Sequence, residues 1–182
     1  GGGAWRLSHL LRGRGGTERA MAGHLAGEPF VLLDDALVAL DAAQVGVSPT
    51  VVIAALGMGD AIPVTAPIIC RGATLRPLVP VHPRAQTLAD GALRLRWTRR
   101  ARGSWLWADG VDAPLHEQAE AYRVGYGPVD APVAQWDVPG PELLLAQATV
   151  AQLAATLPSG SFHVRQRGSY ALSDPLLLHT LS

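Results

Sequence analysis

The sequence predicts an all-β protein in which a small β-rich N-terminal domain is followed by a β-sandwich. One observation is the stretch Ala92–Arg100, where Leu93, Leu95 and Trp97 alternate with polar residues. Alternation with a period of two is the pattern of a half-buried β-strand and not of a helix. A second observation is that seven short segments with strand character follow Pro80, separated by turns. Short strands at such intervals are typical of a β-sandwich.

The composition is that of a globular protein without a strong net charge. Apolar residues make up 48% of the 182 residues and charged residues 16%, which favours a folded chain over a disordered one. The 15 basic and 15 acidic side chains cancel, so we expect neither sequence-specific nucleic-acid binding nor attraction to an anionic membrane. The single cysteine, Cys70, excludes an internal disulfide and a thiolate-cluster zinc site. No apolar run reaches the ~18 residues that a membrane-spanning helix needs.

Residues 1–76 are predicted to form the small β-rich domain. Two apolar runs, Pro29–Leu33 and Leu37–Leu40, flank the acidic pair Asp34 and Asp35, and this arrangement predicts a β-hairpin. Neighbouring carboxylates in a strand or turn point apart, so we do not expect these two to act together as an acid and a base.

Two further strands are expected in this domain, at residues 49–56 and 62–69. The second run contains Pro63 and Pro67, and proline cannot donate a hydrogen bond to a neighbouring strand. We therefore expect this run at the edge of a sheet. Because the sequence begins at Gly1 without a methionine or a signal-peptide core, we expect it to be a piece of a longer chain.

The segment Arg76–Pro83 marks the predicted domain boundary. It contains three prolines, Pro77, Pro80 and Pro83, each of which fixes its own φ and favours an extended conformation in the preceding residue. Such a segment is either a stiff connector or the first strand of a new domain. The predicted domains are therefore residues 1–76 and 77–182.

The predicted strands of the second domain share an alternating or continuous apolar pattern between turn-forming residues. They are Val81–Gln86, Ala92–Arg100, Glu120–Tyr126, Val133–Val138, Pro141–Ala146, Gly160–Arg167 and Pro175–Leu181. One helical turn is expected at Thr149–Leu153, with Thr149 as its N-cap. A long polar loop, residues 101–120, connects the second and third strands.

The order of apolar and aromatic positions resembles that of a fibronectin type III module. The resemblance is carried by Leu93-Arg94-Leu95-Arg96-Trp97, Tyr122-Arg123-Val124, Leu153 and Phe162-His163-Val164-Arg165. Phe162 stands where such modules usually have tyrosine, so the hydroxyl-to-backbone bond of the tyrosine corner cannot form from this position. We therefore expect that the last strands could sit differently from those of such modules.

A second resemblance covers nearly the whole chain. It is carried by Trp5–Glu18, Phe30–Asp34, Leu78–Ala85, Leu95–Arg100 and Pro114–Gln118, and Leu-Leu-Arg-Gly-x-Gly-Gly-Thr-Glu at residues 10–18 is its most specific part. These stretches are similar to the C-terminal region of the baseplate hub protein, also called megatron or host-specificity protein, of gene transfer agents and related siphophage tails in α-proteobacteria.

The second resemblance implies a non-enzymatic, structural role in the baseplate or tip of a phage-like tail. It implies assembly with other copies of the chain as a homotrimer and with neighbouring baseplate proteins, and a part in host-cell attachment or DNA delivery. The expected location is the tail tip of a virion or gene transfer agent, after synthesis in the bacterial cytoplasm.

Trp105 and Trp107 are the candidate carbohydrate-binding residues. They lie in the polar loop 101–120, where strand alternation does not bury them, so they could stack on sugar rings or pack within the loop or a subunit interface. Trp97, on an apolar strand face, is predicted to be a core residue instead. The alternative function is therefore a carbohydrate-binding accessory module of a virion or secreted hydrolase.

No catalytic, metal or cofactor site is predicted. The six histidines form no i, i+4 pair, the glycine-rich stretch at residues 12–18 lacks the Lys-Ser/Thr ending of a P-loop, and no Gly-x-Ser-x-Gly elbow is present. A local basic stripe consists of Arg94, Arg96, Arg99, Arg100 and Arg102. Few aromatic residues interleave with it, and Glu117, Glu120 and Asp109 lie near it in the sequence, so we expect intermodule or surface ion pairs and not a nucleic-acid groove.

Overall fold

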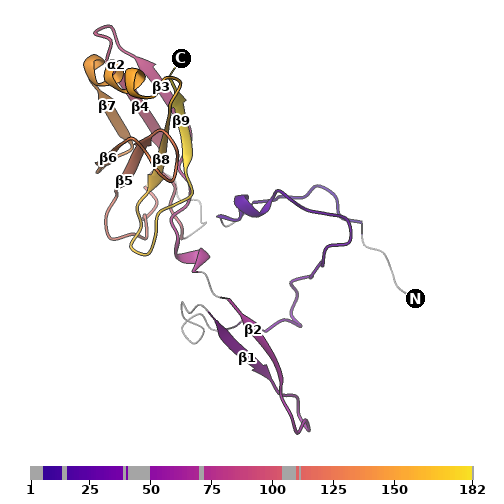
Figure 1. Ribbon diagram of the computed structural model, residues 1–182. Coiled ribbons are helices and arrows are strands. Elements are labelled where there is room, and N and C mark those ends of the chain that lie inside the picture. Colours follow the sequence, from indigo (N-terminus) through magenta and orange to yellow (C-terminus); the bar gives the residue numbers. More distant parts are fainter. Residues whose placement is uncertain are drawn as a thin grey trace. The chain divides into compact units, whose positions relative to one another are not determined.

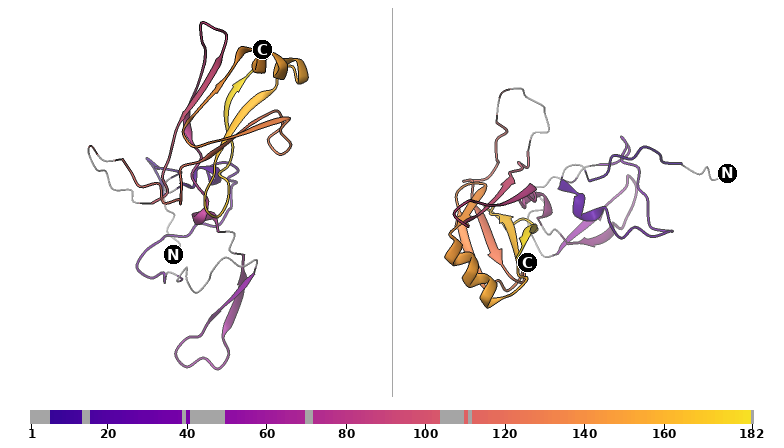
Figure 2. Two further views of the ribbon diagram at one scale, coloured as in Figure 1. Left: turned by 90° about the vertical axis from the view of Figure 1, so that its left-hand side faces the viewer. Right: turned by 90° about the horizontal axis from the view of Figure 1, so that it is seen from above.

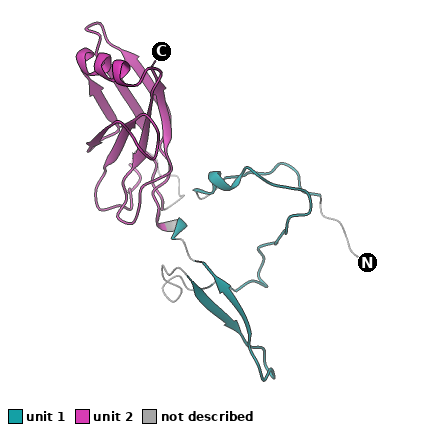
Figure 3. Ribbon diagram, viewed as in Figure 1, with its two compact units in different colours: residues 1–74 teal, residues 75–182 magenta. Residues whose placement is uncertain are grey.

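The chain divides into two compact units, Gly1–Thr74 and Leu75–Ser182 (Figure 3). The structure, a computed structural model, describes residues 6–13, 16–38, 40, 50–69, 72–103, 110 and 112–181. We call the two units unit 1 and unit 2 and describe each by itself. The described residues form a two-stranded sheet in unit 1 and a three-stranded and a four-stranded sheet in unit 2, with one short α-helix among them, so the fold is all-β.

Unit 1 contains an antiparallel hairpin of β1 (Val51–Ala55) and β2 (Val64–Ile68) (Figure 1). Short 3-10 turns lie at Glu18–Ala20 and at Ala73–Leu75, the latter at the junction of the two units. The hairpin forms where two apolar, partly β-branched runs are separated by a Gly-containing turn, which Asp60 closes by accepting a hydrogen bond from the Gly57 N–H at 3.0 Å.

The hairpin predicted between residues 29 and 40 is wrong for the described part of that segment. The acidic turn does form, since the Leu37 N–H donates to the Asp34 carbonyl at 3.1 Å and the Ala36 N–H donates to Asp34 Oδ1 at 3.1 Å. The flanking runs make no ladder, however, and are exposed on both sides. A turn alone does not hold two strands together when no third strand or helix covers them.

Unit 2 is a β-sandwich of seven strands (Figures 1 and 2). One sheet has the order β3-β4-β7 and the other the order β6-β5-β8-β9. The strands are β3 (Val81–Thr87), β4 (Leu93–Thr98), β5 (Tyr122–Tyr126), β6 (Ala134–Val138), β7 (Glu142–Leu145), β8 (Ser161–Gln166) and β9 (Leu176–Thr180). All pairings are antiparallel. This is the fibronectin type III-like sandwich that the sequence predicts, and each predicted strand is confirmed within a few residues at its ends.

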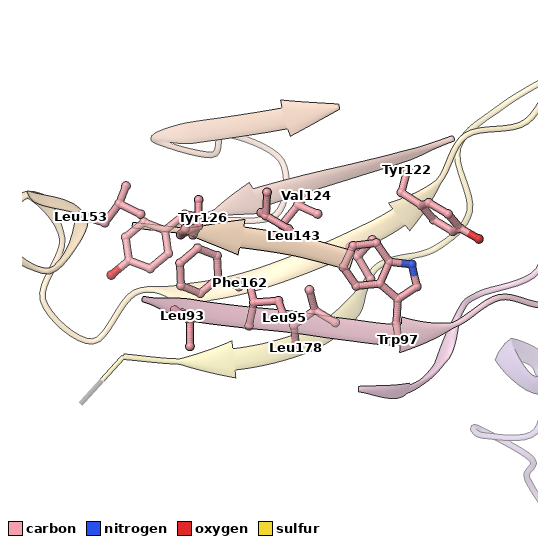
Figure 4. Close-up of a cluster of buried hydrophobic side chains, with 12 residues drawn as sticks. Leu93, Leu95, Trp97, Tyr122, Val124, Tyr126, Leu143, Leu153, Phe162 and Leu178 are labelled. Atoms are coloured by element: carbon pink, nitrogen blue, oxygen red, sulfur yellow. The ribbon is translucent and has the colours of Figure 1, made fainter. Parts of the chain in front are cut away.

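The core lies between the two sheets and is built from the alternate residues of each strand. Leu95, Val124 and Phe162 have no exposed surface, and Trp97 keeps 5% of its surface exposed, which confirms it as a core residue. Trp97 meets Tyr122 edge to face at a centroid distance of 5.3 Å, and Figure 4 shows the pair at one end of the cluster. Burying aromatic residues of this size contributes several kcal/mol, about 0.8 kcal/mol per CH₂ equivalent.

The connection between β7 and β8 contains the helix α2, Gln147–Thr156, at the end of the sandwich where the C-terminus lies (Figure 1). Its N-cap is Ala146, which makes no side-chain cap bond. The predicted N-cap, Thr149, lies inside the helix, so that prediction is wrong. The helix begins earlier because Gln147 and Ala148 are good helix formers that directly follow the strand. Leu153, one of the residues that carry the fibronectin type III resemblance, is buried in the core.

The proline-rich segment before β3 belongs to unit 2. Pro77 and Pro80 are buried, and the Arg76 guanidinium donates to the Leu172 carbonyl at 3.3 Å and to Asp174 Oδ1 at 2.7 Å. These bonds tie residues 76–80 to the connection between β8 and β9. The segment was predicted to be either a stiff connector or the start of a new domain, and these contacts favour the start of a domain.

A tyrosine corner forms, but from a different strand. Tyr126 of β5 is fully buried and its hydroxyl donates to the Leu157 carbonyl at the C-terminal end of α2, at 2.7 Å. Its ring packs on Phe162 of β8 at a centroid distance of 4.7 Å. Tyr126 and Phe162 are register partners on neighbouring strands. The hydroxyl that bonds to the backbone therefore comes from β5 and not from the Phe162 position on β8.

Replacing this tyrosine by phenylalanine tests the corner bond. Tyr126→Phe removes a buried hydrogen bond, while the Leu157 carbonyl keeps the Gly160 N–H as a donor at 3.1 Å, so we expect the free energy of unfolding to fall by about 1 kcal/mol. Urea unfolding followed by tryptophan fluorescence measures the change. The control is Tyr170→Phe, because Tyr170 is 45% exposed, and it should stay within about 0.5 kcal/mol of the wild type. Equal stability of the two variants would show that the corner bond contributes nothing.

Candidate functional site

The candidate binding residues Trp105 and Trp107 lie outside the described residues. The two ends of their loop, residues 99–103 and 112–121, are described and connect β4 to β5. The site is therefore built from these loop ends and from the strands beneath them.

Arg99 holds the outer pair of loop positions together. Its guanidinium forms an ion pair with Asp112 and donates to the Ala113 carbonyl, the latter at 2.9 Å. Arg99 directly follows the last residue of β4, so the alternation of side chains along the strand sets the direction in which its side chain leaves the backbone. The bond joins the first residues after β4 to the segment that returns towards β5.

Arg102 and Glu117 form a buried second contact between the loop ends. Arg102 Nε lies 2.6 Å from Glu117 Oε1, and the same guanidinium donates to the His116 carbonyl at 3.1 Å. The Glu117 side chain is only 1% exposed, and its other oxygen accepts the Ser169 N–H at 2.8 Å. At Gly103, a Cβ would lie 2.2 Å from the His116 ring, so the two loop ends approach as closely as glycine permits.

The hydrogen bonds decide the charge state of Glu117. Burial alone would raise the pKa of its carboxyl, but the hydrogen bond from Arg102 and the N–H of Ser169 outweigh burial and hold the pKa below its usual value. The carboxylate is therefore ionised at neutral pH, and it links the β4–β5 loop to the turn between β8 and β9. We call Arg102, Glu117 and Ser169 the loop clamp.

A cleft of about 480 Å³ lies at the two ends of the β4–β5 loop, where Arg99 and Asp112 line it. It is lined by the indole of Trp97, the guanidinium of Arg99 and the carboxylates of Asp112 and Glu120, among others. Glu120 accepts a hydrogen bond from the Tyr122 hydroxyl at 2.7 Å, and burial together with this bond raises the pKa of Tyr122. These groups can hold a polar ring or a peptide by hydrogen bonds, and they include no activated nucleophile.

Sequence reasoning found the basic stripe and one of its partners, Glu117, which pairs with Arg102. The prediction of ion pairs is confirmed for Arg96, which lies 3.1 Å from Glu142, and for Arg99 and Arg102 as described above. Asp109, another expected partner, lies outside the described residues. The burial of Glu117 and its bond to Ser169 were not predicted, because nothing in the local sequence indicates that this side chain is buried.

The described ranges also bear on two other kinds of site, a metal centre and a membrane span. No group of three or more His, Cys, Asp or Glu residues there could hold a metal ion. None of the helices in that part of the chain has the length and apolar character needed to cross a bilayer.

Comparison with known proteins adds a match in unit 1. A family model described as Rcc01698-like, C-terminal, matches residues 1–31, and this family is associated with gene transfer agents. No curated protein matches the chain. Among solved structures the chain is similar to the crystal structure of the rat CD45 extracellular region, domains d3-d4, with 9% identity and a TM-score of 0.41, over 99% of this chain and 85% of that one. The fold assignment of unit 2 rests on its own strand order.

The loop clamp predicts a pH-dependent stability. Because the pKa of Glu117 is lowered in the folded state, its contribution is complete above pH 4.5, the ordinary pKa, and is lost as the pH falls from there through the folded pKa. We expect Glu117→Gln to lower the free energy of unfolding by about 2 kcal/mol at pH 7. Its difference from the wild type should shrink below about pH 4.5.

Unfolding experiments at a series of pH values between neutrality and acid measure both effects. Glu142→Gln is the matched control, because Glu142 is 46% exposed and pairs with Arg96 at the surface. Such a pair contributes about 0–1 kcal/mol. A difference between Glu117→Gln and wild type that does not change with pH would contradict an ionised, stabilising Glu117.

Proposed function

We propose that the chain is a non-enzymatic structural component of the baseplate or tip of a phage-like, gene transfer agent tail. In this proposal unit 1 assembles with other copies of the chain, as a homotrimer, and with neighbouring tail proteins. Unit 2 is a rigid sandwich module carried by that assembly, which takes part in host-cell attachment or DNA delivery. The place of action is the tail tip of the released particle.

The observation that carries the proposal is the absence of a core in the described part of unit 1. None of the described residues from 6 to 69 is buried. Eighteen large hydrophobic residues in this range are exposed, including Leu33, Val38 and Met58. A soluble monomer rarely exposes so many large apolar side chains within one segment, and exposed apolar surfaces mark contacts with other proteins.

The hairpin β1–β2 has the properties of an assembly element. Asp60, in its turn, is the single charged residue between positions 50 and 69. Both faces are apolar, as Val52 on one face and Val64 on the other are 63% and 75% exposed. Both outer edges of this two-stranded sheet carry unpaired backbone groups. A hairpin of this kind is stable when other strands cover its faces and edges.

The family match supports the proposed location. It falls on residues 1–31, which include the Leu-Leu-Arg-Gly-x-Gly-Gly-Thr-Glu stretch on which the resemblance to baseplate hub proteins is based. Sequence similarity and exposed apolar surface therefore occur in the same unit. This agreement favours an assembly role over a free-standing module.

Self-association of the whole chain tests the proposal. We expect light scattering coupled to size exclusion to show a concentration-dependent trimer. The double variant Val52→Lys plus Val64→Lys introduces one charge on each face of the hairpin. Each buried valine contributes about 1.5–3 kcal/mol, so association should weaken at least about tenfold. Leu144→Lys is the control, because Leu144 is 53% exposed on the sandwich. A wild type that stays monomeric at high concentration would refute assembly through copies of the chain.

The alternative, a carbohydrate-binding accessory module, is favoured by one observation. The cleft beneath the β4–β5 loop combines an indole with charged hydrogen-bonding groups, next to the loop that contains Trp105 and Trp107. Glycan-array binding of the full chain tests this function. If the loop tryptophans form the platform, Trp105→Ala plus Trp107→Ala should abolish binding, because stacking contributes about 1–3 kcal/mol per ring. Folding is checked by circular dichroism, and an array without signal would rule this alternative out.

A further inference from the structure

A pocket of about 230 Å³ lies on the outer face of the four-stranded sheet, away from the β4–β5 loop. Its floor is a row of register partners, Gln135 of β6, Gly125 of β5 and His163 of β8. The next row contains Arg123 and Arg165. We call this the sheet pocket. Nothing in the proposed assembly role uses it.

Gly125 keeps the floor of the sheet pocket open. Glycine in the middle of a strand marks a bulge, a sharp bend or a close approach of another group. No bulge is present, because the pairing of β5 with β6 and with β8 continues through Gly125 without a register shift. A Cβ there would lie 3.1 Å from Pro132 Cβ. Glycine therefore lets Pro132 form one wall and leaves the space beside it for a ligand.

The charges around the pocket leave one guanidinium suited to a ligand. Arg123 is fixed by two hydrogen bonds to Asp137, at 2.9 and 3.0 Å, so it is a neutralised part of the wall. Arg165 is 27% exposed and lies 3.6 Å from Asp130, which is 97% exposed. A contact of this length to a solvated carboxylate is weak. Arg165 can therefore exchange it for a bidentate contact with a bound carboxylate.

The other polar groups match hydroxyls. Burial is the main cause that lowers the pKa of His163, with a contribution from Arg165, so the ring is neutral at pH 7 and has one donor and one acceptor nitrogen. The Gln135 amide likewise donates and accepts. Apolar wall is supplied by Pro128, Pro132 and Leu172. A ligand that combines hydroxyls, an apolar ring face and a carboxylate satisfies all of these groups together.

We propose that the sheet pocket binds a single acidic sugar residue of the hexuronic acid type, with the sugar carboxylate on Arg165 and hydroxyls on Gln135 and His163. A neutral sugar would leave Arg165 without a counter-charge from the ligand. An acidic peptide is disfavoured because Asp130 at the pocket and Asp137 beside Arg123 repel a run of carboxylates, while the amide and the imidazole would lack hydroxyl partners. The volume fits one ring and not an extended chain buried along its length.

Titration of the full chain with galacturonate, observed by NMR, tests the proposal. We expect chemical-shift changes centred on Gln135, Gly125 and His163, and weaker or no changes with glucose. Arg165→Gln should lower the affinity at least about tenfold, since a charge-assisted hydrogen bond contributes about 1.5–3 kcal/mol. The control Arg96→Gln, on the other sheet and 64% exposed, should leave the affinity unchanged.

Three outcomes would overturn the proposal: no shifts at tens of millimolar galacturonate, equal shifts with glucose, or stronger binding of a glutamate-rich peptide than of galacturonate. The melting temperature of each variant is measured to exclude unfolding. Should Arg165→Gln be unstable, Gln135→Ala provides a second variant, and it should weaken galacturonate binding without changing the shifts that the peptide causes. Assembly of the chain is measured by light scattering and not by this titration. A negative titration therefore refutes ligand binding in the sheet pocket but not the proposed function, and a monomeric chain refutes assembly but not ligand binding.

Discussion

The packing of two apolar sheet faces against each other is the interaction on which the other features of unit 2 depend. Leu95 comes from one sheet, and Val124 and Phe162 come from the other, and all three have no exposed surface. Because side chains alternate along a strand, burying these positions forces their neighbours outwards. The outer rows, including Arg123, Gly125 and His163, are therefore placed by the core. The position of each surface group in the sheet pocket follows from packing on the opposite face.

Buried polar bonds then fix the two ends of the sandwich. At the end with α2, the Tyr126 hydroxyl satisfies the Leu157 carbonyl. At the other end, Glu117 accepts from Arg102 and from the Ser169 backbone. Each bond joins a loop to a strand or turn that is distant in sequence. A buried polar group that loses its hydrogen-bond partner costs about 1–3 kcal/mol. This cost opposes any movement of a loop that would break its bond.

The sequence predicts the strands of unit 2 well because one face of each strand is buried and the other is not. Because only one face is buried, apolar residues occupy every second position of the strand, as Leu93, Leu95 and Trp97 do. The same reasoning fails at residues 29–40, where apolar runs flank a turn but no covering layer follows. Apolar character alone does not distinguish a strand of a sheet from an exposed apolar segment that forms no strand. The loop clamp could not be predicted, because burial of Glu117 depends on Ser169, which lies 52 residues further along the chain.

The contrast between the two units is an argument about where stability comes from. Unit 2 buries a core of its own between its sheets and pairs several of its surface arginines with carboxylates. The described part of unit 1 has abundant leucine, valine and isoleucine but buries none of them. Conformational entropy opposes ordering by about 1–2 kcal/mol per residue, and only buried surface offsets it on this scale. In the proposed function, other chains cover the apolar surface of unit 1 and supply the burial that its order needs. In the proposed function, neighbouring chains order unit 1 and its own core orders unit 2, and this division is suited to connecting an assembly to what lies outside it.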